Sequence, residues 1–121
     1  MPVSFAGLMC HAPIVVPAVG GDEAASCAHT TRAMREVAGR AVASRPDRLV
    51  LISPHSPRHH RRWGAWTGRH RGDLSAFRAP QSAVDLPDAP EVAEALGLSP
   101  IHTNEPLDHG AVVPLHFLWE A

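Results

Sequence analysis

The sequence predicts an α/β fold, a largely parallel sheet with flanking helices packed on it. Two apolar stretches, residues 3–10 and 48–53, have the length and composition of strands. Between them, residues 22–44 carry apolar side chains at helical spacing on one face and arginines on the other. A strand, a helix and a second strand in this order form a crossover unit, whose two strands lie parallel in one sheet.

The second predicted strand also places a histidine. Residues 49–52 are four consecutive aliphatic residues, a pattern typical of a strand that is buried on both faces. Pro54 ends this strand, because proline has no amide hydrogen for the ladder and restricts the residue before it. His55 therefore stands at the carboxyl end of a core strand, and His11 follows the first strand in the same way. Ligands of open α/β sheets bind at these strand ends.

The boundaries of the other elements follow from caps and breakers. Asp22 is a favourable N-cap for the long helix, and Pro46 ends it after Ser44. The rest of the chain predicts short elements: a strand or hairpin arm at 63–68, a turn at 69–72, a helical turn within 73–77, a strand at 82–86, a helix at 89–96, a strand at 101–103 and a helix after Gly110.

Composition limits the class of protein. The 121 residues form one domain at most, residues 1–121, with 45% hydrophobic and 19% charged side chains. A net charge of -1 gives no overall attraction to nucleic acid or to an anionic membrane, and no apolar run approaches the ~20 residues of a membrane span. A basic segment followed by an apolar one is missing from the amino terminus, so we expect a cytoplasmic protein.

A basic run is the one strong charge feature. Residues 58–71 contain five arginines and three histidines, with Trp63 and Trp66 between them. This run is compatible with a patch that binds phosphate or nucleic acid. It is equally compatible with a solvated hairpin that packs its tryptophans underneath. We favour the hairpin and expect no nucleic-acid partner, because the rest of the chain offsets the charge.

Three histidines are candidates for chemistry. Neutral imidazole is the commonest metal ligand in proteins, and the strand-end positions of His11 and His55 suit that role. The alternative is that each ring only caps its strand by binding a backbone carbonyl. His109 lies in the motif Asp108-His109-Gly110, where the carboxylate could fix the tautomer of the ring and the glycine would let a substrate approach the backbone.

Taken in order, four motifs resemble the class III extradiol ring-cleavage dioxygenases, in particular their catalytic B-type subunit and the related DOPA dioxygenase-like and Memo-like proteins. The motifs are Phe-Ala-Gly-Leu-Met-Cys-His-Ala-Pro-Ile at 5–14, Gly-Gly-Asp at 20–22, Ile-Ser-Pro-His at 52–55 and Leu-Asp-His-Gly-Ala-Val-Val-Pro-Leu at 107–115. The resemblance covers nearly the whole chain and implies the amino-terminal half of such an enzyme. It implies that His11 and His55 are ligands of a non-haem Fe(II) and that His109 is an acid–base group beside dioxygen and substrate.

The implied activity is Fe(II)-dependent opening of a catechol-type ring by dioxygen, with a small aromatic diol as substrate. A site of two histidines and one carboxylate leaves open positions at which both reactants bind. Family members are considerably longer, and their later half supplies the third ligand, usually a glutamate. Two alternatives stay open. One is a non-catalytic metal-binding or interaction module, and the other is a Zn-dependent hydrolase, since two histidines suit zinc equally well.

The last ten residues predict association with another chain. They contain six large apolar side chains with no later element to cover them: Val112, Val113, Leu115, Phe117, Leu118 and Trp119. A sheet that ends after its first half also has an open edge. We therefore expect a homo-oligomer, most simply a twofold dimer, or a complementing chain.

Overall fold

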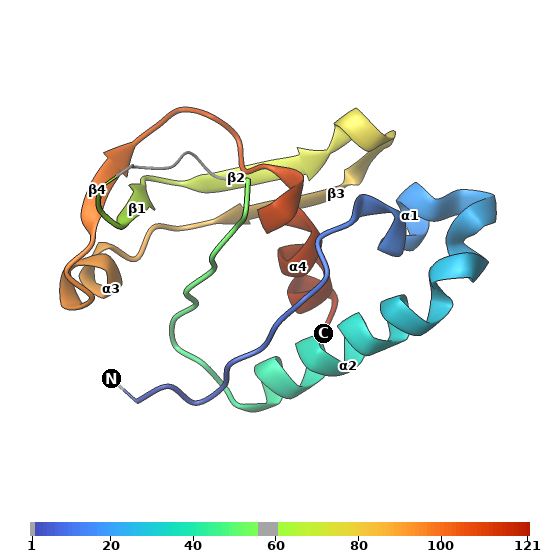
Figure 1. Cartoon of the computed structure of the whole chain (residues 1–121), viewed down its shortest axis with the longest axis horizontal. Helices are drawn as coiled ribbons and strands as arrows, with labels where there is room; N and C mark the ends of the chain where they lie inside the picture. The colour runs from blue at the N-terminus through green and yellow to red at the C-terminus, as the bar shows by residue number, and fades with distance from the viewer. Residues whose placement is uncertain (1, 56–60) are drawn as a thin grey trace.

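The computed structural model describes residues 2–55 and 61–121 and confirms an α/β fold with a parallel sheet and helices (Figure 1). In chain order the elements, with η for a 3-10 helix, are η1 (Pro13–Val15), α1 (Pro17–Gly20), η2 (Gly21–Cys27), α2 (Ala28–Ala43), β1 (Gly64–Thr67), β2 (His70–Leu74), η3 (Ser75–Phe77), β3 (Ala79–Leu86), α3 (Pro90–Ala95), β4 (Ser99–His102) and α4 (His109–Glu120). Among the described residues, none of these helices has the length and apolar character needed to cross a membrane.

The strands form two small sheets. Strands β1 and β4 pair in parallel, with Gly64 opposite Ser99. Strands β2 and β3 pair antiparallel, and their register shifts between Asp73 and Leu74. The chain crosses from β1 to β4 through β2, β3 and α3, as two parallel strands require a connection longer than a hairpin.

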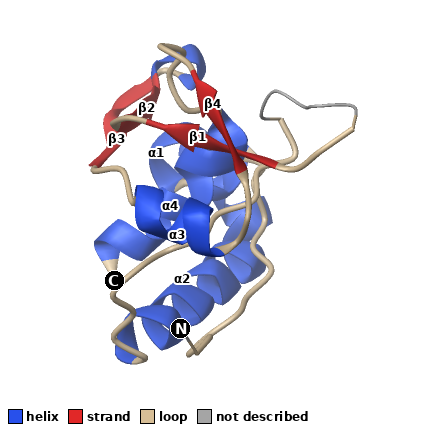
Figure 2. Cartoon of the chain, turned by 90° about the vertical axis from the view of Figure 1, so that its left-hand side faces the viewer, coloured by secondary structure: helices blue, strands red, loops and turns tan. Residues whose placement is uncertain are grey.

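Helix α4 lies at the centre of the core. It packs against α2 on one side and against β2 and β3 on the other (Figure 2). Val112 and Phe117 of α4 are buried, as are Met34 of α2, Leu74 of β2 and Val84 of β3. The position of the first residue of α4, His109, is therefore fixed by the best-packed element of the chain.

The strands predicted at residues 3–10 and 48–53 are not formed. Both segments run as stretched chain that pairs with no described strand (Figure 1). The expectation that residues 49–52 are buried on both faces is also wrong, because Val50 and Ile52 are exposed. Leu51 is partly buried and packs against the core. Of residues 49–52, only Leu51 is thus covered.

Two boundaries differ from the prediction because local turns intervene. Helix α2 begins at Ala28 with Cys27 at its N-cap, since residues 21–27 form η2; the end at Ser44 is confirmed. Residues 69–72 are not a turn. Gly68, at φ 95°, makes the turn directly after β1, and the chain enters β2 at His70.

The basic run is only partly described. Residues 56–60 lie outside the described residues. Of the two tryptophans expected to pack beneath a hairpin, Trp66 of β1 is partly buried, whereas Trp63 is 78% exposed. The prediction that Trp63 packs beneath a hairpin is therefore wrong. Trp63 precedes β1 and does not share the packing of that strand.

The apolar carboxyl-terminal helix finds cover within the chain. Four of its six large side chains are buried against α2 and the strands, namely Val112, Val113, Leu115 and Phe117. Leu118 is partly buried and packs against the same core, and Trp119 is 71% exposed. The expectation that these side chains need a second chain to cover them is wrong for most of them, because earlier elements of the chain pack over the helix. The apolar character of this helix is therefore no argument for self-association.

This burial predicts unequal effects for two aromatic residues of α4. Phe117→Ala should lower the free energy of unfolding by about 3–5 kcal/mol, because it leaves a cavity in the core. Trp119→Ala should change it by less than about 1 kcal/mol, because the indole is mostly in water. Urea unfolding followed by circular dichroism measures both. Equal effects would contradict the burial of Phe117.

Candidate functional site

Three histidine rings from distant parts of the chain meet at one place. His11 follows the first stretched segment, His55 follows the second, and His109 is the first residue of α4. The ring centres of His11 and His55 are 5.0 Å apart, and those of His55 and His109 are 4.5 Å apart. The centres of His11 and His109 are 6.1 Å apart. The structure thus brings together the three histidines that the sequence singles out.

A hydrogen-bond network fixes the second stretched segment against the start of α4. Asp108 caps the helix, and its Oδ1 accepts a hydrogen bond from the Gly110 N–H at 2.7 Å. The same oxygen accepts a hydrogen bond from the Ser53 hydroxyl at 3.0 Å. The Ser53 oxygen in turn accepts the His55 N–H at 3.3 Å. His55 and His109 are thereby placed by one carboxylate.

Gly110 is in direct contact with this network. A Cβ added at Gly110 would lie 2.5 Å from Ser53 Oγ and 2.9 Å from His55 Cδ2, closer than real Cβ atoms approach. Glycine is therefore the residue that lets the His55 segment pack on α4. The sequence suggested that this glycine makes room for a substrate; in the structure its close neighbours belong to the chain itself.

The segment before α4 is held from its other side by β2. The Leu107 N–H donates to the Arg71 carbonyl at 2.7 Å. Gly72 permits this approach, since a Cβ there would lie 2.6 Å from the Leu107 carbonyl oxygen. The segment after His11 is tied to α2 by the buried Thr31 hydroxyl, which donates to the Val15 carbonyl at 2.7 Å. The segment that leads into His109 and the segment that follows His11 are thus both attached to core elements.

The surroundings of His109 favour its neutral form. Partial burial lowers the pKa of His109, and the neighbouring rings of His55 and His11 lower it further, while Asp108 opposes them. The ring of Phe77 stands edge-on to it, with centres 5.3 Å apart. A neutral imidazole can accept a proton at neutral pH, which is the first requirement for a general base.

The separation of His11 and His55 fits two ligands on one ion. With metal–nitrogen bonds of about 2.1 Å and angles of about 90–110° at the ion, two bound imidazoles have their centres about 4.6–5.3 Å apart. The observed 5.0 Å lies within this range. In residues 2–55 and 61–121, no group of three or more His, Cys, Asp or Glu side chains forms a complete metal site. Among the described residues, His11 and His55 are thus a pair whose spacing is compatible with a shared ion.

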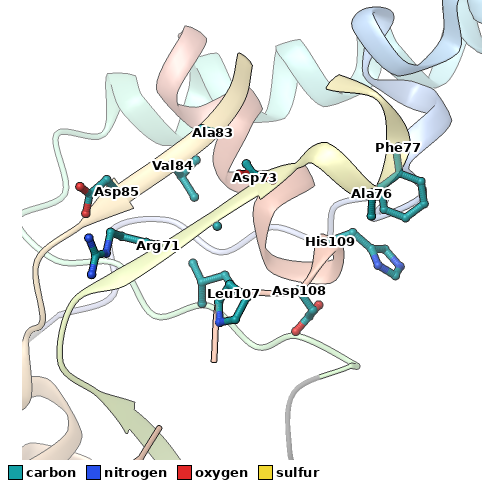
Figure 3. A pocket seen from close by; sticks show the side chains of 12 residues that line it. Arg71, Asp73, Ala76, Phe77, Ala83, Val84, Asp85, Leu107, Asp108 and His109 are labelled. Atoms are coloured by element: carbon teal, nitrogen blue, oxygen red, sulfur yellow. The ribbon is translucent and has the colours of Figure 1, made fainter. Parts of the chain in front are cut away.

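A cavity of about 670 Å³ lies beside His109, within the size range of small-molecule sites. Figure 3 shows His109 and Phe77 at one end of it and Arg71 and Asp85 at the other. Asp85 is paired with Arg69. The wall between the two ends is largely apolar and includes Ala76, Ala83, Val84 and Leu107.

Sequence reasoning missed two residues that build this site. The sequence predicts Ser53 only as the end of a strand, whereas in the structure its hydroxyl donates to Asp108 and its oxygen accepts the His55 N–H. Phe77 lies in a short helical turn, and no sequence pattern distinguishes an aromatic residue there from a packing residue.

The contact at Gly110 predicts a matched pair of glycine substitutions. Gly110→Ala should cost about 1–3 kcal/mol of stability through overpacking and should displace the His55 ring. Gly39→Ala should be neutral or stabilising by about 0.5–1 kcal/mol, because Gly39 is exposed in α2 with nothing within 4 Å of the added Cβ. Thermal unfolding, with the histidine ring signals followed by NMR, reports both effects. Unchanged ring signals in Gly110→Ala would contradict the contact.

Comparison with known proteins gives two matches. The family model described as the catalytic LigB subunit of aromatic ring-opening dioxygenase matches residues 6–121. Protein CA_C1420 of Clostridium acetobutylicum is 28% identical over 129 residues, which cover 92% of this chain and 28% of that protein. The chain therefore spans less than a third of the length of this relative. No solved structure matches the chain significantly.

Proposed function

This chain belongs to the family of catalytic LigB subunits of aromatic ring-opening dioxygenases, and we propose that it carries part of an Fe(II)-dependent extradiol site. The substrates are a small catechol-type diol and dioxygen. The observation that carries the proposal is the meeting of His11, His55 and His109, whose ring centres lie 4.5–6.1 Å apart. The match covers 28% of Protein CA_C1420, so for this chain the activity of a whole family protein is something that we propose.

His11 and His55 hold the iron in this proposal. Their ring separation of 5.0 Å supports it, as does the attachment of the His55 segment to α4 through Ser53. Bound Fe(II) supplies open positions for the diol and dioxygen and the redox chemistry that dioxygen needs. Zinc would suit the same two nitrogens but has no redox chemistry, and therefore iron is the metal that fits a family of dioxygenases.

His109 is the acid–base group of the proposal. The lowered pKa of its ring keeps a nitrogen free to accept the proton of a diol hydroxyl and to return it later to an oxygen of the product. Its place at the start of the buried helix α4 keeps the ring from moving away as the charge changes. Phe77 excludes water from one side of the ring.

The cavity beside His109 is the proposed position of the aromatic ring. Its apolar walls would contact the faces of the ring, and its volume of about 670 Å³ leaves room for a substituted diol. Arg71 at the far end is suited to contact a polar substituent, since its cross-strand neighbour Asp85 is paired with Arg69.

A non-catalytic metal-binding or interaction module is the second candidate. The observation that favours it is that the described residues offer two metal ligands and no complete site.

The location that we propose is the cytoplasm, where the free thiols of Cys10 and Cys27 would stay reduced.

The enzyme proposal predicts turnover that depends on His109. The chain loaded with Fe(II) under anaerobic conditions, then given catechol and dioxygen, should consume dioxygen and form a yellow ring-opened product. His109→Gln should lower turnover by ~10²–10⁴-fold with its iron content unchanged, because it removes an acid–base group. His29→Gln, at the exposed start of α2, is the matched control and should turn over normally.

An oxygen electrode measures the dioxygen that is consumed, and absorbance measures the ring-opened product. If the parent chain binds iron but consumes no dioxygen, the enzyme proposal is wrong and the non-catalytic metal-binding module is supported.

A further inference from the structure

The loop that carries His55 is held by a serine hydroxyl. His55 is exposed, so burial in the core does not fix its position. Its backbone N–H donates to the Ser53 oxygen at 3.3 Å, and the Ser53 hydroxyl donates to Asp108 Oδ1 at 3.0 Å. These two hydrogen bonds connect the backbone of a proposed metal ligand to the N-cap of α4.

The contact between Ser53 and Asp108 is well suited to hold a loop. Both residues are partly buried, so water competes less for their hydrogen bond than it does at an exposed site. The Asp108 oxygen also accepts the Gly110 N–H at 2.7 Å, which fixes the carboxylate on the helix. Hydrogen bonds to a carboxylate are stronger than those between neutral groups.

The start of the same stretch is held more weakly. Arg48 pairs with Glu91 of α3, but their side chains are 54% and 52% exposed, and such ion pairs contribute little in water. Residues 48–53 make no backbone–backbone hydrogen bond with another described residue. The Ser53 hydroxyl is therefore an important restraint at the end of the stretch that leads into His55.

The ring of His55 has a second restraint, which depends on the first. A Cβ at Gly110 would lie 2.9 Å from His55 Cδ2 and 2.5 Å from Ser53 Oγ, so the ring and the hydroxyl both lie against the start of α4. In this position the ring centre is 5.0 Å from that of His11, a separation that fits two ligands of one ion.

We propose that Ser53 is a positioning residue for metal binding, which holds His55 at the separation from His11 that a shared ion requires. Since this role presupposes that His55 binds a metal, it rests on the proposed function. Without the hydroxyl, the loop has to be ordered when the ion binds, and the cost of that ordering lowers the affinity. Ser53 acts through His55 and not on the reacting atoms.

The hydrogen bonds also separate the role of Ser53 from that of His109. The Asp108 oxygen accepts the Gly110 N–H directly, so the cap of α4 does not need the serine. His109 is the first residue of that helix. Removal of the Ser53 hydroxyl should therefore release His55 and leave His109 in place.

Cobalt(II) binding tests the proposal without any turnover. Co(II) accepts imidazole ligands as Fe(II) does, and its visible absorption reports the bound ion. Ser53→Ala should weaken Co(II) binding about 10–100-fold, as expected for the loss of a group that orients a metal ligand. Arg48→Gln, at the other end of the stretch, is the matched control and should bind within about threefold of the parent chain, because it removes only an exposed ion pair. Circular dichroism verifies that both variants are folded.

Two further measurements distinguish positioning from a general loosening of the site. In NMR spectra of the metal-free Ser53→Ala chain, the amide and ring signals of His55 should shift, whereas those of His109 should stay near their parent positions. At saturating Fe(II), oxygen uptake per bound iron should match that of the parent chain. The substitution then raises the metal concentration that is required and leaves the reaction itself unchanged.

Three results would overturn the proposal: unchanged His55 signals in Ser53→Ala, Co(II) binding as tight as in the parent chain, or equal losses of affinity in Ser53→Ala and Arg48→Gln. A parent chain that binds no Co(II) would instead contradict the metal pair of the proposed function, and the role of Ser53 in metal affinity would fall with it. Selective weakening in Ser53→Ala supports the proposal whether or not the parent chain opens a catechol ring.

Discussion

The Asp108 carboxylate joins two parts of the chain that are 55 positions apart, and the arrangement of the site depends on it. One of its oxygens caps α4 through the Gly110 N–H and also accepts the Ser53 hydroxyl. Because α4 is the most buried helix, the core fixes Asp108, and Asp108 then fixes the loop that carries His55. Hydrogen bonds to an ionised acceptor are stronger than those between neutral groups, which suits a contact on which a loop depends.

The three histidines of the site are not held in place in the same way. His109 is the first residue of α4, so its backbone is held by a helix that is packed in the core. His11 and His55 stand at the ends of segments that carry exposed apolar side chains and make no backbone–backbone hydrogen bond with another described residue. Segments with few buried contacts open most easily. The separation of the two proposed ligands therefore depends on the Ser53 contact, which holds the loop of His55.

Much of the site followed from the sequence because its signals are local. The prolines at positions 13 and 54 mark where two stretched segments stop, and the Asp-His-Gly motif marks a helix start, so three histidines could be singled out. Whether residues 3–10 and 48–53 form strands could not be decided from local signals, because a strand exists only when a neighbouring strand completes its ladder of backbone hydrogen bonds. The cover of α4 was likewise missed, since α2 and β2 reach it from distant positions.

The central claim is that His11 and His55 bind one metal ion together. Anaerobic equilibrium dialysis against Fe(II), followed by metal analysis, tests it most directly. The parent chain and the exposed control His29→Ala should each bind a single iron, whereas His11→Ala and His55→Ala should each lose it, because one imidazole alone is a weak ligand. Iron retained in full by both site variants, or no iron bound by the parent chain, would contradict the account.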